Sequence, residues 1–141
     1  MELFKANHFF HLVYTSKPSR QLDEQAIVSL LKESQIYNQN ISISGFLLFG
    51  EDKLIQLIEG KEEDVKELYQ KIKKDKRHFD IAIQHLGYSK NRCMPFLGMG
   101  LCLMRELNNH DYPFFFSKSE AKKFNALIQG EIGEIFEKYL D

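Results

Sequence analysis

The most continuous apolar pattern in the chain lies in residues 43–60, which read ISGFLLFGEDKLIQLIEG. Two apolar runs, residues 43–49 and 54–58, flank a short polar segment that begins with Gly50, and this is the pattern of a β-hairpin. Neither run alternates with polar residues, so both strands are expected to be covered on both faces. The pattern therefore predicts a central hairpin in a sheet with a layer on each side.

One polar residue, Gln56, interrupts the second apolar run. Side chains alternate along a strand, so Gln56 shares a face with Leu54 and Ile58 and its amide is expected to point into apolar surroundings. A buried amide without partners costs roughly 1–3 kcal/mol. We therefore expect Gln56 to be hydrogen-bonded by another side chain, a water or a polar ligand.

Two segments beside the hairpin have helical spacing, residues 22–38 and residues 61–74. The second has acidic residues at its start and lysines at its end, as the helix dipole favours. In the first helix, Leu30, Ser34 and Asn38 are four residues apart and form one row along its surface. A row with two small polar residues is unusual for a helix that packs on a purely apolar core.

The remaining strand patterns are residues 9–14, followed by a loop over residues 15–19, then residues 81–86 and the glycine-punctuated run 94–104. Together with the hairpin and the helices they give the order β-α-β-β-α-β plus a fifth strand. This order predicts an α+β, ferredoxin-like fold, in which two helices cover one face of the sheet.

Residues 119–140 are expected to cover the opposite face as one helix or a helix pair. Ser119 is the expected N-cap, and Gly130 and Gly133 are expected to bend or split the helix. Its apolar stripe consists of Phe124, Leu127, Ile128, Ile132, Ile135, Phe136 and Tyr139.

Composition indicates one domain without a strong electrostatic preference. The chain has 141 residues, 43% of them hydrophobic, and a formal net charge of −1, so no basic field favours nucleic acid or an anionic membrane. Cys93 and Cys102 match no CxxC spacing and are interpreted as buried free thiols. No segment has the pattern of a secretory signal or a membrane span, which predicts a cytoplasmic protein.

Motifs for metal binding or catalysis do not emerge from the spacing. The five histidines lack ligand spacing, and there is no nucleophile motif, GxGxxG or P-loop. The sequence thus predicts neither a metal site nor an enzyme. It does place Tyr14, Asn38 and Gln56 at the inner ends of apolar elements, where they could converge between the helices and the sheet.

Spaced motifs in residues 9–104 resemble the BLUF domains, which sense blue light using FAD. The motifs are HLVYTS with Tyr14, SQIYNQNISISGFLLF with Ser34 and Asn38, LIQLIEG with Gln56, DKRH, and FLGMG with Met99. The resemblance implies that residues 1–104 form a flavin-binding sensor domain, and we expect residues 105–141 to form its C-terminal helical cap.

The resemblance also implies the cofactor site. It places Tyr14, Asn38, Gln56 and Met99 around the flavin ring, with Ser34 in the same motif as Asn38, and the ring between the aliphatic side chains of Leu30 and Ile72. Asp75, Arg77 and His78 match a DxRH pattern at the mouth of the site, where they would reach the ribityl and phosphate end of FAD. Taken singly, each of these residues also has an ordinary structural interpretation.

In such a sensor, as the resemblance implies, light moves an electron and a proton from Tyr14 towards the flavin. Gln56 then changes its hydrogen bonds, and the fifth strand passes the change on through Met99. Two departures stand out: Leu97 and Gly98 replace a frequent Trp-Ser pair, and Tyr37 replaces a frequent polar residue. The first is expected to alter signalling by the fifth strand, and the second to weaken cofactor binding.

The output is not encoded in a recognisable segment. We expect no effector domain after Leu140, so the signal is expected to leave through a separate protein partner or a change in homo-oligomerisation, without nucleic acid or membrane. An alternative function is a ferredoxin-like interaction module that binds no flavin.

Overall fold

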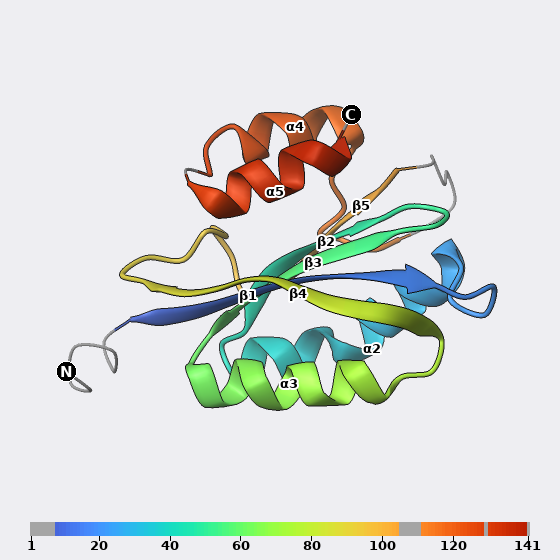
Figure 1. Ribbon diagram of the computed structural model, residues 1–141, viewed down its shortest axis with the longest axis horizontal. Coiled ribbons are helices and arrows are strands. Elements are labelled where there is room, and N and C mark those ends of the chain that lie inside the picture. The colour runs from blue at the N-terminus through green and yellow to red at the C-terminus, as the bar shows by residue number, and fades with distance from the viewer. Residues whose placement is uncertain (1–7, 105–110, 129, 141) are drawn as a thin grey trace.

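The computed structural model describes residues 8–104, 111–128 and 130–140 (Figure 1). Its elements, in chain order, are β1 (Phe9–Pro18), α2 (Glu24–Asn40), β2 (Ser44–Phe49), β3 (Leu54–Gly60), α3 (Glu62–Lys74), β4 (His78–Ser89), β5 (Gly98–Leu103), α4 (Lys118–Asn125) and α5 (Glu131–Leu140). This order confirms the predicted α+β, ferredoxin-like arrangement with a fifth strand.

The five strands form one sheet in the order β4-β1-β3-β2-β5. The pairs among the first four strands are antiparallel, whereas β5 runs parallel to β2. Helices α2 and α3 cover one face, and α4 and α5 cover the other (Figure 1). The hairpin is therefore central, and the C-terminal segment, expected as one helix or a helix pair, lies as a pair on the face opposite α2 and α3.

Alternation along β3 divides its side chains between two cores. Leu54 and Ile58 pack in the core under α2 and α3, whereas Ile55 and Leu57 pack under α4 and α5. Gln56 stands between Leu54 and Ile58 on the same side of β3 and is 5% exposed, so it faces the α2–α3 layer as predicted.

Several strand boundaries differ from the sequence prediction, and β4, expected over residues 81–86, extends over His78–Ser89. β1 continues through residues 15–18, expected to be a loop, because Thr15 and Ser16 still pair with Ile55 and Leu54 of β3. β5 begins at Gly98 rather than at residue 94, because its partner β2 begins at Ser44, directly opposite Gly98. Residues 94–97 precede the strand as a bend.

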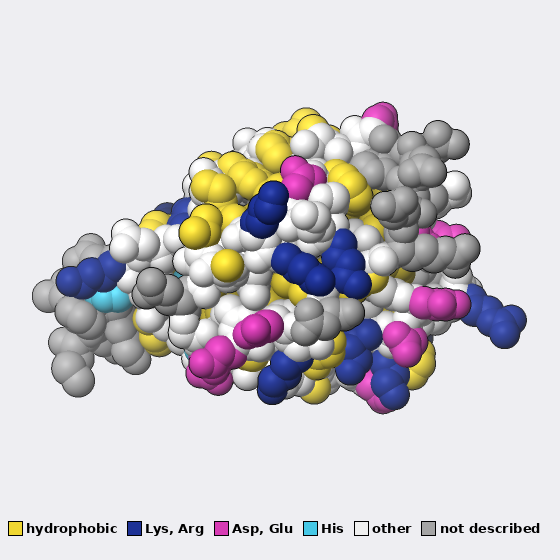
Figure 2. All heavy atoms as spheres, turned by 90° about the horizontal axis from the view of Figure 1, so that it is seen from above, with side chains coloured by type: hydrophobic (Ala, Val, Ile, Leu, Met, Phe, Trp, Pro, Cys, Tyr) yellow, Lys and Arg dark blue, Asp and Glu magenta, His cyan; other side chains and the backbone are white. Residues whose placement is uncertain are grey.

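The C-terminal layer is a helix pair separated at Gly130, whose φ of +85° suits glycine. The N-cap is Ser117 and not Ser119: the Ser117 hydroxyl accepts from the Glu120 N–H, and the Glu120 carboxylate accepts from the Ser117 N–H, a complete capping box. Leu127 does not belong to the buried stripe, since it is 78% exposed. Figure 2 shows this layer from outside, with apolar side chains among lysines and acidic residues.

The two cysteines are free thiols in different environments. Cys102 is buried in β5, but Cys93 is half-buried and lies outside the strands, so the expectation of two buried thiols is wrong for Cys93.

Within the described part of the chain, no helix has the length and apolar character needed to cross a bilayer.

Candidate functional site

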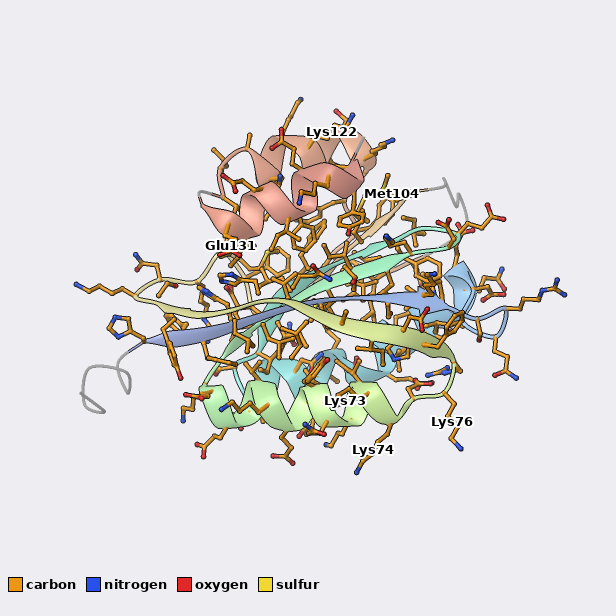
Figure 3. All side chains as sticks on the ribbon, viewed as in Figure 1. Lys73, Lys74, Lys76, Met104, Lys122 and Glu131 are labelled. Carbon is orange, nitrogen blue, oxygen red and sulfur yellow. The ribbon has the colours of Figure 1, made fainter. Side chains whose placement is uncertain are left out.

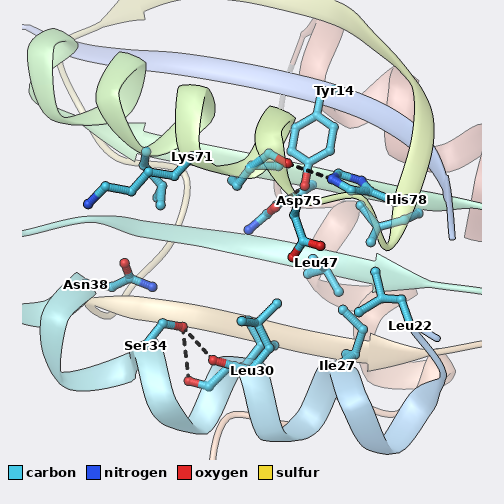
Figure 4. Close-up of a pocket in the computed structure, with 15 residues that line it drawn as sticks. Tyr14, Leu22, Ile27, Leu30, Ser34, Asn38, Leu47, Lys71, Asp75 and His78 are labelled. Atoms are coloured by element: carbon cyan, nitrogen blue, oxygen red, sulfur yellow. Dashed lines mark hydrogen bonds between the residues drawn. The ribbon is translucent and has the colours of Figure 1, made fainter. Parts of the chain in front are cut away.

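A cavity of about 200 Å³ lies between α2, α3 and the sheet (Figure 4). Most of its lining is aliphatic, with a small number of polar groups, which is the composition of small-molecule sites. The lining residues are Tyr14, Leu22, Ile27, Leu30, Leu31, Ser34, Asn38, Leu47, Leu54, Gln56, Leu68, Lys71, Ile72, Asp75 and His78. The cavity thus contains all the cofactor residues expected from the sequence except Arg77 and Met99.

A chain of three buried side chains closes the sheet side of the cavity. The Tyr14 hydroxyl donates to Gln56 Oε1 at 2.5 Å, and Gln56 Nε2 donates to Met99 Sδ at 3.4 Å. Tyr14 and Gln56 are direct partners across β1 and β3, which explains why they meet. Met99 lies just behind the cavity wall and is 1% exposed.

The close approach of β5 depends on a glycine in β2. Gly45 stands opposite Met99 in the parallel pair, and a Cβ on Gly45 would lie 2.0 Å from the Leu57 carbonyl oxygen and 3.0 Å from Met99 Cε. Any larger residue would push β3 or Met99 away. The glycine in the ISG tripeptide thus keeps Met99 within reach of Gln56.

Tyr14 is a neutral phenol in this environment. Burial raises its pKa well above the ordinary value, and the nearby Tyr69 and Asp75 raise it further. Its ring packs against Tyr69, with centroids 5.6 Å apart, and against His78 at 6.3 Å. The hydroxyl proton is therefore held on Tyr14 and directed at Gln56.

The row on α2 presents one satisfied and one unsatisfied polar group. The Ser34 hydroxyl donates to the Leu30 carbonyl at 2.9 Å, so its proton is already used within the helix. Asn38 Oδ1 is buried and has no hydrogen-bond partner among the described residues. Because an amide oxygen can only accept, this site has room for an N–H or O–H donor from a bound molecule.

The three residues of the DxRH pattern, Asp75, Arg77 and His78, have different positions and different partners at the mouth of the cavity. Asp75 lines the cavity and holds the Arg77 guanidinium at 2.7 Å, and hydrogen bonds from Arg77 lower the pKa of Asp75. Arg77 therefore lies behind Asp75 and not on the cavity wall. His78 Nε2 donates to the Ile72 carbonyl at 2.8 Å, and Nδ1 lies 2.8 Å from Ser16 Oγ, so both ring nitrogens already have protein partners.

Lys71 at the mouth was missed by sequence reasoning. Its position beside Ile72 on α3 fits the solvated face of an amphipathic helix, so the pattern carries no signal for a site residue. Lys71 nevertheless lines the cavity, and its Nζ lies 5.0 Å from the ring centroid of Tyr37 on α2. The pair bridges the two helices at the mouth, which gives Tyr37 a role that the sequence did not predict.

A second missed group holds the start of β5. Gln35 Oε1 accepts from the Met99 N–H at 3.3 Å and from the Tyr112 hydroxyl at 3.0 Å, and that hydroxyl also contacts the Met99 carbonyl. Gly98 has φ +101°, and a Cβ there would lie 2.4 Å from Gln35 Nε2. Glycine at 98 therefore makes room for the Gln35 side chain, which is a physical account of one departure noted in the sequence.

Residues 9–100 match the family described as "BLUF: Sensors of blue-light using FAD". The chain is 29% identical over 84 residues to photoactivated adenylate cyclase subunit beta of Euglena longa, covering 60% of this chain and 10% of that protein. It is 30% identical over 99 residues to the blue light- and temperature-regulated antirepressor BluF of Escherichia coli (strain K12), covering 67% and 23%. This chain thus spans less than a quarter of either relative.

The fold agrees with a solved member of the same group. The dark-state structure of BlrB, a BLUF protein, superposes with a TM-score of 0.64 at 25% identity, over 84% of this chain and 79% of that one. The family is one of sensors rather than enzymes, and its match extends over well more than half of the chain. The chain therefore belongs to the BLUF family and is a flavin-based sensor of blue light.

Proposed function

We propose that the cavity between α2 and α3 holds the ring of FAD and that Tyr14, Gln56 and Met99 form the hydrogen-bond chain that responds to light. The observation that carries this proposal is the continuous contact from Tyr14 through Gln56 to Met99 at the edge of the cavity. Gln56 both accepts and donates there, so one side chain links the cavity to β5.

The lining fits a flavin ring, which has flat apolar faces and hydrogen-bonding atoms along one edge. Leu30 on α2 and Ile72 on α3 both line the cavity and supply aliphatic contact for the faces. The ring edge carries an N–H group between two carbonyls, and the buried Asn38 Oδ1 lacks such a donor. We infer that Asn38 binds this edge, with the Ser34 oxygen beside it.

The mouth suits the phosphate end of FAD. The cavity of about 200 Å³ is smaller than pockets that enclose a whole drug-sized ligand, roughly 300 Å³ or more, so the ring would enter and the rest would extend past the mouth. Lys71 offers a cation there, while Asp75 and His78 form the wall that the ribityl chain would pass. Lys73 and Lys74 at the C-terminal end of α3 and Lys76 just after it are exposed, with Lys74 and Lys76 pointing away from the domain (Figure 3), and they add positive charge.

When bound, the flavin supplies blue-light absorption and an electron acceptor. Loss of an electron to the flavin would make the Tyr14 phenol strongly acidic, and Gln56 Oε1, which accepts from that hydroxyl, would lie on the path by which the proton follows the electron towards the flavin. A half-turn of the amide would place Nε2 towards Tyr14 and Oε1 towards Met99 Sδ. Because a thioether accepts and cannot donate, the rotated amide would lose its bond to Met99.

Release of Met99 gives the signal a route out of the sensor. Leu101 of β5 accepts from the Phe116 N–H at 2.7 Å and donates to the Phe114 carbonyl at 2.9 Å, so β5 is tied to the segment that leads into α4. We infer that residues 105–141 form a cap that follows movement of β5. The two curated relatives are named as a cyclase and an antirepressor, which supports control of an effector, here a separate protein partner or a second copy. A cytoplasmic location stays a prediction.

Substitution of Gln56 by leucine tests the proposal. The aliphatic walls remain, so the Gln56→Leu protein is expected to retain flavin but to lose the small red shift of absorption after blue light. Gln84→Leu is the matched control, because Gln84 donates to Thr15 Oγ1 at 3.1 Å on the same sheet and lies outside the cavity. A full red shift in Gln56→Leu would overturn the assigned role of this residue.

The identity of the cofactor is tested separately. Flavin released from the purified protein on denaturation is expected to have the mass of FAD. Wild-type protein that stays colourless after incubation with FAD would favour the flavin-free interaction module.

A further inference from the structure

Three side chains of metal-ligand type meet on the sheet face that carries α4 and α5. They are His11 in β1, Glu59 in β3 and Cys93 in the segment after β4, and one ligand atom from each lies within 4.8 Å of the others. Each comes from a different element, so the spacing of histidines and cysteines along the sequence, which predicted no metal cluster, could not show this one.

The strands and the following loop fix the positions of these groups. His11 and Glu59 are direct partners across β1 and β3. The backbone N–H groups of Cys93 and Met94 donate to the two Glu59 carboxylate oxygens at 2.8 and 2.9 Å, and Ser44 Oγ donates to Oε1 at 2.9 Å. Oε1 thus has two donors, whereas Oε2 has one backbone donor and faces His11 Nε2 at 3.6 Å.

The Glu59 carboxylate is buried beside one ionisable partner. Its side chain is fully buried, and in the described residues its one ion-pair contact is His11. His11 Nε2 also lies 3.0 Å from Ser89 Oγ, a contact that a metal ion bound at this nitrogen would replace. Arg92 contacts Ser44 Oγ at 2.7 Å and reaches the carboxylate only through that hydroxyl. Hydrogen bonds from Ser44 and from two backbone N–H groups partly offset the burial of this carboxylate, and a metal ion beside Oε2 would add a positive charge that these donors do not supply.

We propose that His11, Glu59 and Cys93 bind one zinc ion. Imidazole nitrogen, carboxylate oxygen and thiolate sulfur are the three donor types that zinc takes in proteins, with a water molecule left to complete a tetrahedron. Calcium and magnesium prefer oxygen ligands throughout, so they do not suit this set. The proposal concerns the face away from the flavin and does not rest on the photocycle.

Binding of zinc at this site would release one proton, which comes from the Cys93 thiol. Burial and the neighbouring Glu59 carboxylate raise the pKa of the Cys93 thiol to about 12, so the thiol keeps its proton until a cation replaces it. Zinc would displace that proton to solvent and form the S–Zn bond. Thiolate and carboxylate together then neutralise the doubly charged ion, and the segment between β4 and β5 becomes cross-linked to the sheet.

Metal content of the purified holoprotein, made without a polyhistidine tag, tests the proposal. After incubation with zinc chloride and gel filtration, elemental analysis is expected to find about one zinc per chain. Cys93→Ser and His11→Ala are expected to weaken binding at least about tenfold, since even the loss of a supporting group costs about 10–100-fold. Cys102→Ala is the matched control, because it removes the other thiol and leaves the three ligands in place.

A cobalt titration gives an independent measurement. Tetrahedral cobalt in the site is expected to give d–d bands at longer wavelength than flavin absorption, and these bands are expected to be absent in Cys93→Ser. The flavin spectrum of each variant reports whether the domain is folded. If wild-type protein retains no zinc, or if Cys93→Ser retains as much as wild type, the cluster is only a hydrogen-bonded clamp and the proposal is wrong.

Discussion

The same strands form both faces of the sheet, but the side chains on the two faces are packed differently. Under α4 and α5, the Phe46 ring packs against Phe116 and Phe136 with centroids 5.4 and 5.8 Å apart, and the void beside Phe46 is about 10 Å³. Under α2 and α3, a cavity of about 200 Å³ remains, bordered by Gln56 and the unpaired Asn38 oxygen. Around Phe46 the first face is filled by aromatic rings of the chain itself, whereas the second leaves room between its helices and the sheet for a ring that the chain does not contain.

The difference shows where stability and function are separated in this domain. A close-packed aromatic layer gains its free energy from the chain alone. A cavity with an unpaired buried acceptor costs free energy that a bound ligand restores. We therefore expect the α4–α5 face to determine whether the protein stays folded, and the α2–α3 face to determine how strongly flavin stabilises it.

Removal of the C-terminal layer should have the largest effect. Deletion of the residues after Lys118 removes nearly all of α4 and the whole of α5, and would expose the apolar residues of the sheet that they cover, among them Phe46, Leu48 and Leu57. We expect the truncated protein to aggregate, because exposed apolar patches of this kind self-associate. Size-exclusion chromatography and thermal unfolding measure this. A truncated protein that is monomeric and as stable as the full chain would show that the residues after Lys118 are not part of the same folded unit.

A single ring in that layer should have the next largest effect. Phe136 is 2% exposed, so Phe136→Ala is expected to lower the free energy of unfolding by about 3–5 kcal/mol. Leu127 in the same layer is 78% exposed, and Leu127→Ala is expected to change it by less than about 0.5 kcal/mol. Urea unfolding of both variants gives the comparison. Equal costs at the two positions would contradict the assignment of Leu127 to the surface.

An aliphatic wall of the cavity should behave differently. Leu30 borders empty space in the flavin-free chain, so Leu30→Ala is expected to cost less than the roughly 2–5 kcal/mol typical of a well-packed leucine. With flavin bound, the same change removes contact with the ring and should reduce the affinity. Urea unfolding with and without flavin, together with flavin titration, separates the two effects. A full packed-core cost without flavin would mean that the cavity is closed in solution.

The sequence predicted the position of a side chain correctly where the periodicity of its own strand or helix determines that position. Gln56 faces the α2–α3 layer because a strand has a period of two, and Asn38 lies in the cavity because a helix repeats after about four residues. The motif spacings led to the correct family, since they sample several elements at once. The helical C-terminal layer followed from the apolar stripe, and of the bend or split expected at Gly130 and Gly133, the structure has a split at Gly130.

The remaining features depend on contacts between distant segments. The extent of β1 through Pro18 is set by its partners in β3 and β4, which the local sequence does not contain. The N-cap is an exception, because the spacing of Ser117 and Glu120 is the local pattern of a capping box and indicates Ser117 rather than the predicted Ser119. Gln35 lies on α2 beside site residues, yet its contacts with Met99 and Tyr112 follow from the packing of β5.

The smallest expected effect concerns the hydroxyl of Tyr112, which contacts the Met99 carbonyl and Gln35 Oε1 at the edge of the sheet that adjoins the cavity. Tyr112→Phe keeps the buried ring but leaves both acceptors without this donor, at a cost of roughly 0.5–1.5 kcal/mol. We expect unchanged flavin content and roughly two- to tenfold faster amide exchange in β5, since a local opening of that strand becomes easier. Hydrogen exchange followed by mass spectrometry measures this.

Tyr139→Phe, on α5 of the close-packed face, is the matched control and should leave β5 unchanged. Equal exchange in β5 for the two variants would mean that strand pairing with β2 alone holds Met99 in place, and that the side chains beyond the cavity do not contribute.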